Sequence, residues 1–257
     1  MNQFEKEIIN RIKENKNNKI LLDSAKDFFI HSALSKYSYN FQALGRPIIQ
    51  YPQDIIAIQE IIWKIKPDLI IETGIAHGGS LIMSASMLAL LDISDAIKDG
   101  VSAFNPMKSK RKVIGIDINI KSHNNEAIKD HPMSSHIQMI EGSSIDPLII
   151  EQVKKISRDY KCVMVCLDSN HTHNHVLAEL KAYAPLVSLE SYCIVFDTII
   201  EDMPINTFLD RPWGRGNSPK TAVYEYLKDH SEFEIDKNIQ NKLLITVAPD
   251  GYLKRKK

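Results

Sequence analysis

Five acidic residues each follow a short apolar run, and they are the first sign of chemistry in this chain. They are Glu72, Asp117, Glu141, Asp168 and Asp197. Short apolar runs separated by helical patterns are typical of parallel strands in a sheet covered on both faces. Ligands of such sheets bind beyond the carboxyl ends of the strands, so we expect the acids to line one binding site.

The segment from Glu72 to Ser80 predicts a tight turn from a strand into a helix. It reads Glu-Thr-Gly-Ile-Ala-His-Gly-Gly-Ser. Glycines let the backbone approach a ligand closely, and amides at a helix start can bind it. The spacing differs from the Gly-x-Gly-x-x-Gly dinucleotide fingerprint and lacks the Lys-Ser/Thr of a P-loop. It favours a nucleoside without a diphosphate, such as S-adenosylmethionine (SAM); the alternative is an ordinary strand-to-helix turn.

Two further strand ends predict contacts to such a nucleoside. The carboxylate of Asp117 can accept hydrogen bonds from both ribose hydroxyls, with a helix N-cap as the alternative role. Glu141 and Ser143 could border the adenine, although a helix-capping loop explains Ser143 nearly as well.

Asp168 and Asp197 predict a metal site. They end neighbouring apolar strands, where two unpaired carboxylates repel and a cation between them relieves the repulsion. Hard oxygen ligands favour Mg²⁺ or a similar divalent ion over zinc. His171 lies three residues past Asp168, where its imidazole could take a proton from a substrate hydroxyl. We expect His173 and His175 to be solvated residues at a helix start rather than zinc ligands.

The composition excludes several classes of protein. The 257 residues carry equal numbers of basic and acidic residues, so no charge excess points to nucleic acid. Three cysteines without metal-ligand spacing indicate reduced thiols in a cytoplasmic protein. The N-terminus lacks the apolar core of a signal peptide, and we expect no apolar stretch to reach the roughly 20 residues of a membrane span.

The pattern along the chain predicts one α/β domain of Rossmann-like type, with a helical cap at 1–66 and a catalytic core at 67–257. One or two helices cover 4–35, interrupted near Asn15 to Asn18, and 37–52 reads as a loop. Asp54 is expected to cap a helix that Pro67 stops. The expected strands are 69–72, 113–117, 137–140, 162–167 and 192–197. The expected helices between them are 79–91, 123–130, 146–158 and 174–184.

The remaining segments predict a loop and a C-terminal hairpin. Residues 92–112 read as a loop insertion, and 219–229 as a helix. Two strand-like runs follow at 232–235 and 242–247, and Gly251-Tyr252 suggests an antiparallel terminal hairpin beside a mostly parallel sheet.

The chain resembles the cephalosporin hydroxylase and rhamnosyl O-methyltransferase family, whose members are SAM-dependent enzymes with a Rossmann-like fold. Matching segments run in order from about residue 40 to 255, so the resemblance covers nearly the whole chain. They include Asn40-Phe41, Gly45 to Ile48, Tyr51-Pro52 with Asp54, Glu72-Thr73-Gly74, His77 to Ser80, Gly115 to Asp117, Glu141 to Ser144, Leu167 to Thr172, Asp197-Thr198, Pro212 to Gly214 and Pro249 to Leu253.

The resemblance implies roles for the residues in these motifs. SAM would lie near Glu72, Gly74, Ser80 and Asp117. Places in the same turn and at the strand ends add Thr73, His77, Gly78, Glu141, Ser143 and Asp168 to the expected cofactor site. A divalent metal such as Mg²⁺ would be bound by Asp168 and Asp197, with His171 beside Asp168 as general base, and Thr198, Glu201, Asp202 or water would replace a ligand that this chain lacks. Related enzymes often have Glu-Asp where this chain has Phe196-Asp197, so one expected carboxylate is missing.

The sequence as a whole predicts a SAM-dependent O-methyltransferase, assisted by a divalent metal. Its acceptor would be a hydroxyl of a sugar, of a glycan precursor or of a related small molecule. The loop 211–217 is expected near the acceptor, where Trp213 could stack on a sugar ring, or pack inward instead. A non-catalytic SAM- or nucleotide-binding module and an NAD(P)-dependent oxidoreductase are the alternatives, and a homo-oligomer is left open.

Overall fold

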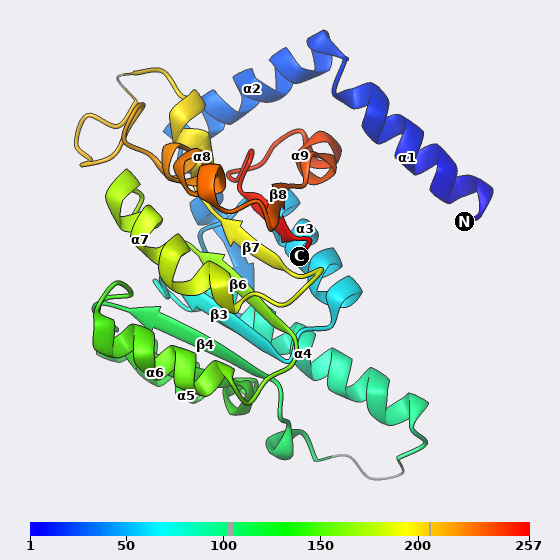
Figure 1. The fold of residues 1–257 in the computed structure, drawn as a ribbon, viewed down its shortest axis with the longest axis vertical. Coiled ribbons are helices and arrows are strands. Elements are labelled where there is room, and N and C mark those ends of the chain that lie inside the picture. Colours follow the sequence, from blue (N-terminus) through cyan, green and yellow to red (C-terminus); the bar gives the residue numbers. More distant parts are fainter. Residues whose placement is uncertain (102–104, 206) are drawn as a thin grey trace.

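A seven-stranded sheet forms the centre of the computed structural model, which describes residues 1–101, 105–205 and 207–257 (Figure 1). The strand order is β5-β4-β3-β6-β7-β9-β8. The first five strands are parallel, whereas β9 runs antiparallel to both β7 and β8. The strands are β3 (Leu69–Thr73), β4 (Lys112–Asp117), β5 (Ile137–Glu141), β6 (Val163–Leu167), β7 (Tyr192–Val195), β8 (Phe233–Ile235) and β9 (Tyr252–Arg255). The expected Rossmann-like sheet with C-terminal antiparallel strands is confirmed.

Helices cover both faces of this sheet because its strands are apolar on both sides. In β3, Ile70 packs in one core cluster while Leu69 and Ile71 pack in the other, as the alternation of strand side chains requires. The helices are α1 (Gln3–Asn15), α2 (Lys19–Leu34), α3 (Pro52–Ile65), α4 (Gly79–Lys98), α5 (Ser122–Lys129), α6 (Pro147–Ser157), α7 (His173–Tyr183), α8 (Pro219–Asp229) and α9 (Lys237–Leu243). Helices α3, α4 and α5 contribute to the first cluster, and α6, α7 and α8 to the second.

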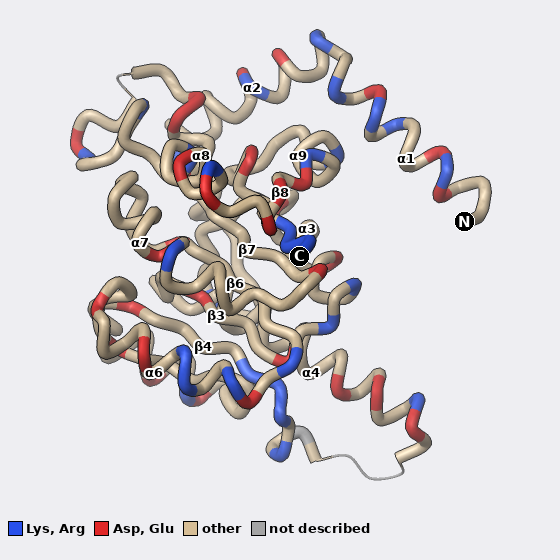
Figure 2. The backbone as a smooth tube through the Cα atoms, in the orientation of Figure 1, with Lys and Arg blue, Asp and Glu red and all other residues tan. Residues whose placement is uncertain are grey.

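The N-terminal helices break where the asparagine run predicted. The Asn18 side chain caps α2 by accepting from the backbone N–H of Leu21. Helix α1 buries none of its residues and extends away from the sheet, with basic and acidic residues alternating along it (Figures 1 and 2). Helix α2 buries Ala25, Phe29 and Ser32 against the rest of the protein.

Residues 37–52 are more ordered than the expected loop. A 3-10 helix, η1 (Tyr37–Asn40), leads into an antiparallel pair, β1 (Phe41–Ala43) and β2 (Arg46–Ile48). Leu44 and Gly45 both have positive φ, 48° and 88°, which suits a two-residue hairpin turn. Strands of three residues leave too little alternation in the sequence to predict.

Two expected boundaries in the rest of the chain are wrong. Helix α4 continues to Lys98, so the expected insertion at 92–112 begins inside a helix, and its residues 102–104 lie outside the described part. The expected strand at 242–247 is the end of α9 followed by a loop. The C-terminal pair is β8 and β9 with α9 between them, rather than a tight hairpin.

The expectation that no apolar stretch reaches the length of a membrane span is wrong for helix α4. Its 20 residues are long and apolar enough to cross a membrane by length and composition alone. The helix packs in the core instead, where Leu81, Leu88 and Leu91 have no exposed surface.

Asp54 does not cap α3 but lies buried in its first turn. Tyr51 occupies the N-cap position. The carboxylate of Asp54 accepts hydrogen bonds from the Thr246 hydroxyl, the Val247 backbone N–H (2.9 Å) and the Tyr252 hydroxyl (2.7 Å). Burial raises the pKa of Asp54 to about 6. This one side chain therefore ties α3 to the segment before β9 and to β9 itself.

Replacing Asp54 by Asn is expected to lower the free energy of unfolding by about 2–3 kcal/mol, because an amide N–H would then face buried donors. Chemical denaturation at neutral pH measures this change. The matched control is Asp27→Asn on α2, which alters an exposed carboxylate and should stay within about 0.5 kcal/mol of wild type. Equal stability of the two variants would contradict the assigned role of Asp54.

Candidate functional site

Three predicted residues meet at the carboxyl edge of the sheet. One carboxylate oxygen each from Asp168 and Asp197 and one imidazole nitrogen of His171 all lie within 4.8 Å of one another. Asp168 directly follows β6, where its backbone N–H donates to the Thr73 carbonyl of β3 at 2.9 Å. His171 lies in the loop before α7, and Asp197 follows β7. Neighbouring parallel strands thus bring together side chains that are far apart in the sequence.

The backbone of Asp197 turns its side chain toward His171. Its φ of 55° is left-handed, which is uncommon for a residue with a Cβ and recurs at functional sites. The carboxylate lies 3.2 Å from the His171 Nε2. The Trp213 ring packs edge-on against the imidazole, with the ring centroids 4.8 Å apart. The imidazole is therefore held from two sides.

The carboxylates at this edge of the sheet would be stabilised by a bound positive charge. Burial raises the pKa of Asp168 well above its ordinary value, and the nearby carboxylates of Asp197 and Glu72 raise it further. The Gln50 side chain donates one hydrogen bond to Asp168 at 3.1 Å. Asp168 thus has one neutral donor among the described residues for a buried carboxylate that lies beside two further acids, so the oxygen ligands here fit a divalent cation. Phe196, where a further acid was expected, is buried in the core and offers no ligand.

Glu72 is a second buried acid beside this group. It is 4% exposed, and within the described residues its one hydrogen bond comes from the Ser80 hydroxyl. Burial raises the pKa of Glu72 to about 7. A ligand that brought a positive charge close to Glu72 would favour its ionised form.

The glycines of the turn are required by close backbone approach. A Cβ on Gly74 would lie 2.0 Å from the Asp168 carbonyl oxygen, and φ at Gly74 is +89°. A Cβ on Gly79 would lie 2.3 Å from the Pro47 carbonyl oxygen. The turn is therefore enclosed between the β6 end on one side and β2 on the other.

Asp117 holds the turn from the neighbouring strand end. Its Oδ2 accepts from the backbone N–H groups of Ile75 (2.8 Å) and Ala76 (3.3 Å). Its Oδ1 accepts from the Asn119 backbone N–H at 3.1 Å. The predicted bond to ribose stays a prediction, and a role in shaping the turn is added to it.

The segment after β2 contributes a residue that sequence reasoning missed. Gln50 is buried, and in the described part of the chain its Oε1 has no hydrogen-bond partner. It lines a cavity of about 50 Å³ together with Gly74, Ser80 and Asp168. Its position beside the matching Gly45–Ile48 and Tyr51-Pro52 segments was the available signal. Its partner Asp168, 118 residues away, could not be read from spacing.

Two predicted cofactor residues lie within the turn. The His77 side chain is exposed, and its carbonyl accepts from Arg46 Nη2 at 2.7 Å. Gly78 has φ +83° and stands at the N-cap of α4.

The remaining predicted residues lie around the same edge. The Thr73 hydroxyl accepts from the Asp168 backbone N–H at 3.3 Å. Glu141 is exposed at the end of β5, and Ser143 lies two residues further in the loop before α6. Thr198 is buried and its hydroxyl donates to the Pro249 carbonyl at 2.6 Å, so the proposed ligand is already engaged elsewhere. Their contacts to cofactor or metal stay predictions.

The two histidines that follow His171 lie at the start of α7, as expected, but they are partly buried and have side-chain partners rather than being fully solvated. His173 lies 2.8 Å from the Thr221 hydroxyl and 3.1 Å from a Glu225 carboxylate oxygen. His175 lies 3.0 Å from the Ser144 hydroxyl. Both histidines therefore join α7 to neighbouring elements and are kept apart from the Asp168 group.

The chain is similar in sequence to proteins of one known family. A model of the family described as Rhamnosyl O-methyltransferase/CmcI matches residues 35–256. The rhamnosyl O-methyltransferase of Mycobacterium tuberculosis (strain ATCC 25618 / H37Rv) is 30% identical over 204 residues, which cover 79% of this chain and 73% of that protein. The protein of the same name from Mycobacterium leprae (strain TN) is 28% identical over 215 residues, covering 83% and 82%.

A solved structure supports the fold. A CmcI structure with Mg and SAM is similar to this one with a TM-score of 0.53 at 20% identity, covering 84% of this chain and 77% of that one. At this identity the likeness concerns the fold, and it confirms the Rossmann-like architecture.

The raised pKa of Glu72 predicts a pH-dependent stability. The pKa of Glu72 is about 7 in the folded state and 4.5 ordinarily, so the folded state binds its proton more tightly than the unfolded state. The stability that this proton binding contributes is fully present below pH 4.5 and is lost as pH rises through 7. Glu72→Gln keeps a neutral side chain. Wild type should therefore lose about 3 kcal/mol of unfolding free energy relative to this variant between pH 4 and pH 8.

Urea denaturation across this pH range measures the difference. Glu141→Gln, at the exposed end of the next-but-one strand, is the control and should reproduce the wild-type profile. Parallel profiles of wild type and Glu72→Gln would show that the acid is not desolvated.

Proposed function

This chain belongs to the rhamnosyl O-methyltransferase/CmcI family and is an S-adenosylmethionine-dependent O-methyltransferase, and we propose that its acceptor is a hydroxyl of a sugar or glycan precursor. Family membership sets aside the non-catalytic module and the oxidoreductase. The observation that supports the proposed chemistry is the convergence of Asp168, His171 and Asp197 beside the glycine turn. A methyl donor on one side and an acceptor hydroxyl on the other would meet there.

The methyl donor is proposed to lie along the glycine turn. The close approach at Gly74 leaves backbone beside the cavity, and Asp117 stands at the next strand end, where a ribose would lie. Glu72 and Asp168 provide negative charge for the sulfonium and ammonium groups of SAM. The Oε1 of Gln50, which has no partner among the residues that the structure describes, would accept a hydrogen bond from the same ligand.

Asp168 and Asp197 are proposed to hold a divalent ion such as Mg²⁺, since two carboxylates at neighbouring strand ends supply hard oxygen ligands. Such an ion would lower the pKa of an acceptor hydroxyl. The residues of the chain would fix the carboxylates in place: Gln50 bonds Asp168, and the left-handed backbone aims Asp197.

His171 is proposed as the general base. In the reaction the bond between the methyl carbon and sulfur breaks, a bond from that carbon to the acceptor oxygen forms, and the hydroxyl proton passes to the imidazole Nδ1, because Nε2–H faces Asp197. Asp197 lies 3.2 Å from Nε2 and would stabilise the charged imidazolium. Trp213 limits the movement of the ring and stands where a sugar could pack.

The acceptor and the cellular setting are inferred from more general features. The relatives are named rhamnosyl O-methyltransferases, which supports a deoxysugar acceptor and a role in carbohydrate biosynthesis. The free thiols of Cys162, Cys166 and Cys193 support a cytoplasmic location. Exposed Trp63 and Ile97 on α3 and α4 support association into a homo-oligomer.

Asp197→Asn is expected to weaken Mg²⁺ binding at least about 10-fold, because a carboxylate ligand is lost. Calorimetric titration of Mg²⁺ measures the change, and turnover should vanish in EDTA and return with Mg²⁺. Asp210→Asn, in an exposed loop, is the control and should bind Mg²⁺ like wild type. Full turnover in excess chelator would rule out the metal.

His171→Ala is expected to lower turnover by about 10²–10⁴-fold, the range for loss of a general base. Affinities for S-adenosylhomocysteine and for Mg²⁺ should stay at wild-type values. His173→Ala is the control, since that side chain bonds to Thr221 and Glu225 instead, and it should keep most turnover. A parallel loss of Mg²⁺ affinity in His171→Ala would make His171 a metal ligand rather than the base.

A further inference from the structure

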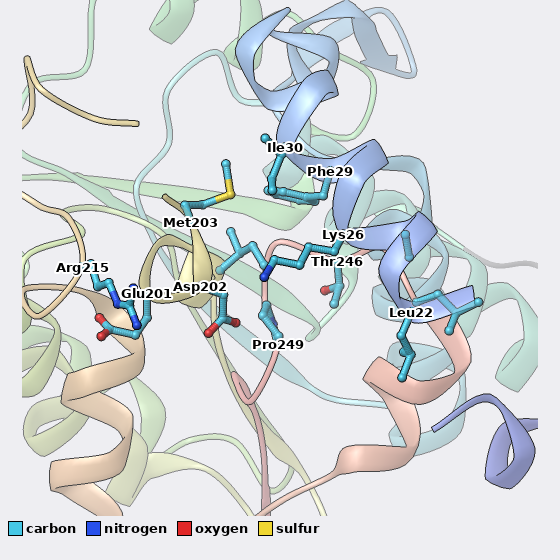
Figure 3. A pocket seen from close by; sticks show the side chains of 13 residues that line it. Leu22, Lys26, Phe29, Ile30, Glu201, Asp202, Met203, Arg215, Thr246 and Pro249 are labelled. Atoms are coloured by element: carbon cyan, nitrogen blue, oxygen red, sulfur yellow. The ribbon is translucent and has the colours of Figure 1, made fainter. Parts of the chain in front are cut away.

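A second cavity, of about 430 Å³, lies between α2, the 3-10 helix η5 (Thr198–Asp202) and the loop 244–249 (Figure 3). Its volume falls in the range of about 300–1,000 Å³ that is usual for small-molecule sites. No residue of the glycine turn and no member of the Asp168 group lines it. It is therefore separate from the region proposed for the methyl donor.

One side of this cavity is apolar. Phe29 and Ile30 of α2 and Met203 after η5 gather there (Figure 3). Phe29 and Met203 are buried, and the Phe29 ring stacks on Tyr51 at 4.8 Å between centroids. Leu22, further along α2, extends this apolar wall toward the rim. The wall suits a hydrocarbon or aromatic group of a ligand.

The charged side chains in and beside the cavity carry a net positive charge. Glu201 already accepts from the Gly216 N–H at 2.9 Å and the Ser218 hydroxyl at 2.7 Å. Asp202 is paired with Lys220. Lys26 and Arg215, in contrast, have no ion pair within the described parts of the chain. Lys26, Arg215 and Lys220 are three cations against the two acids Glu201 and Asp202, so the cavity and its surroundings carry one net positive charge and favour an anion.

The cavity adjoins the reacting groups through two segments. Helix η5 begins directly after Asp197, so its Ile199 and Glu201 carry the cavity wall away from the metal residues. The loop that brings Arg215 to the cavity also brings Trp213 onto His171. A ligand in the cavity could therefore extend a sugar toward His171.

The α2 wall lies before the stretch that the family model matches. Leu22, Lys26 and Phe29 all precede residue 35, where the family match begins. This wall can therefore select an acceptor that the shared catalytic residues do not specify.

We propose that this cavity binds the non-reacting part of the acceptor, and that the acceptor is a glycosyl phosphate ester carrying an apolar or aromatic group. This inference rests on the proposed function. Lys26 and Arg215 would bind the phosphate, and the wall of Leu22, Phe29 and Met203 would bind the apolar group. The phosphate ester could come from a nucleoside diphosphate sugar or from a lipid-linked sugar phosphate, which share this chemistry.

Calorimetry on the full chain with Mg²⁺ and S-adenosylhomocysteine tests the proposal. The probes are thymidine diphosphate rhamnose, rhamnosyl decyl phosphate and the neutral decyl rhamnoside. At least one phosphate probe should bind about 10-fold or more tightly than the neutral one, and which phosphate probe binds better identifies the source of the ester. Lys26→Gln and Arg215→Gln should each remove about 5–10-fold for the phosphate probe and nothing for the neutral one.

Matched controls separate the cavity from the rest of the surface. Lys19→Gln on the same helix lies outside the cavity and should leave all affinities unchanged. Leu22→Ser should weaken the decyl probes several-fold, whereas Ile20→Ser, at an 82% exposed position, should not. Affinity for S-adenosylhomocysteine should be the same in every variant.

Two failures are distinguishable. Wild type that does not bind S-adenosylhomocysteine would overturn the proposed function and this inference with it. Three results would overturn this inference alone, provided that wild type binds S-adenosylhomocysteine. Wild type could bind no rhamnosyl probe, or it could bind the neutral probe as tightly as the phosphate probes. Alternatively, Lys26→Gln and Arg215→Gln could leave the affinity for the phosphate probes unchanged.

Discussion

Repulsion among carboxylates at one edge of the sheet is the constraint on which the site depends. Strands β3, β6 and β7 are neighbours, and each carries or precedes an acid at this edge: Glu72, Asp168 and Asp197. The raised pKa values of Glu72 and Asp168 show that the folded chain by itself does not stabilise their charges. A sulfonium donor and a divalent ion would both supply the missing charge, so the same acids can serve both ligands.

Local patterns predicted the parts of the molecule that local physics determines. The parallel strands follow from short apolar runs, and the break between α1 and α2 follows from Asn18 as a cap. The Asp168–His171–Asp197 group could be predicted because strand ends converge at one edge of a parallel sheet. Asp54 and Gln50 could not, since their roles depend on partners 192 and 118 residues away. The β1–β2 pair was missed because three-residue strands carry almost no periodicity.

The chemistry and the choice of acceptor are supported by different parts of the chain. The residues proposed for methyl transfer lie on the sheet edge within the family match at 35–256. The apolar wall of the larger cavity comes mainly from α2, before that match begins. Loop 211–217 links the two, because Trp213 contacts His171 while Arg215 lines the cavity. In this chain the residues proposed for methyl transfer and the residues proposed to bind the rest of the acceptor therefore lie in different segments.

The segment that covers the glycine turn has a consequence for how the donor enters. Between residues 47–50 and the turn, the space is about 50 Å³, far below the roughly 300 Å³ at which ligand sites begin. A whole nucleoside does not fit there, so the donor proposed along the turn would have its ribose and adenine outside this space, toward Asp117 and Glu141, and would enter from that side.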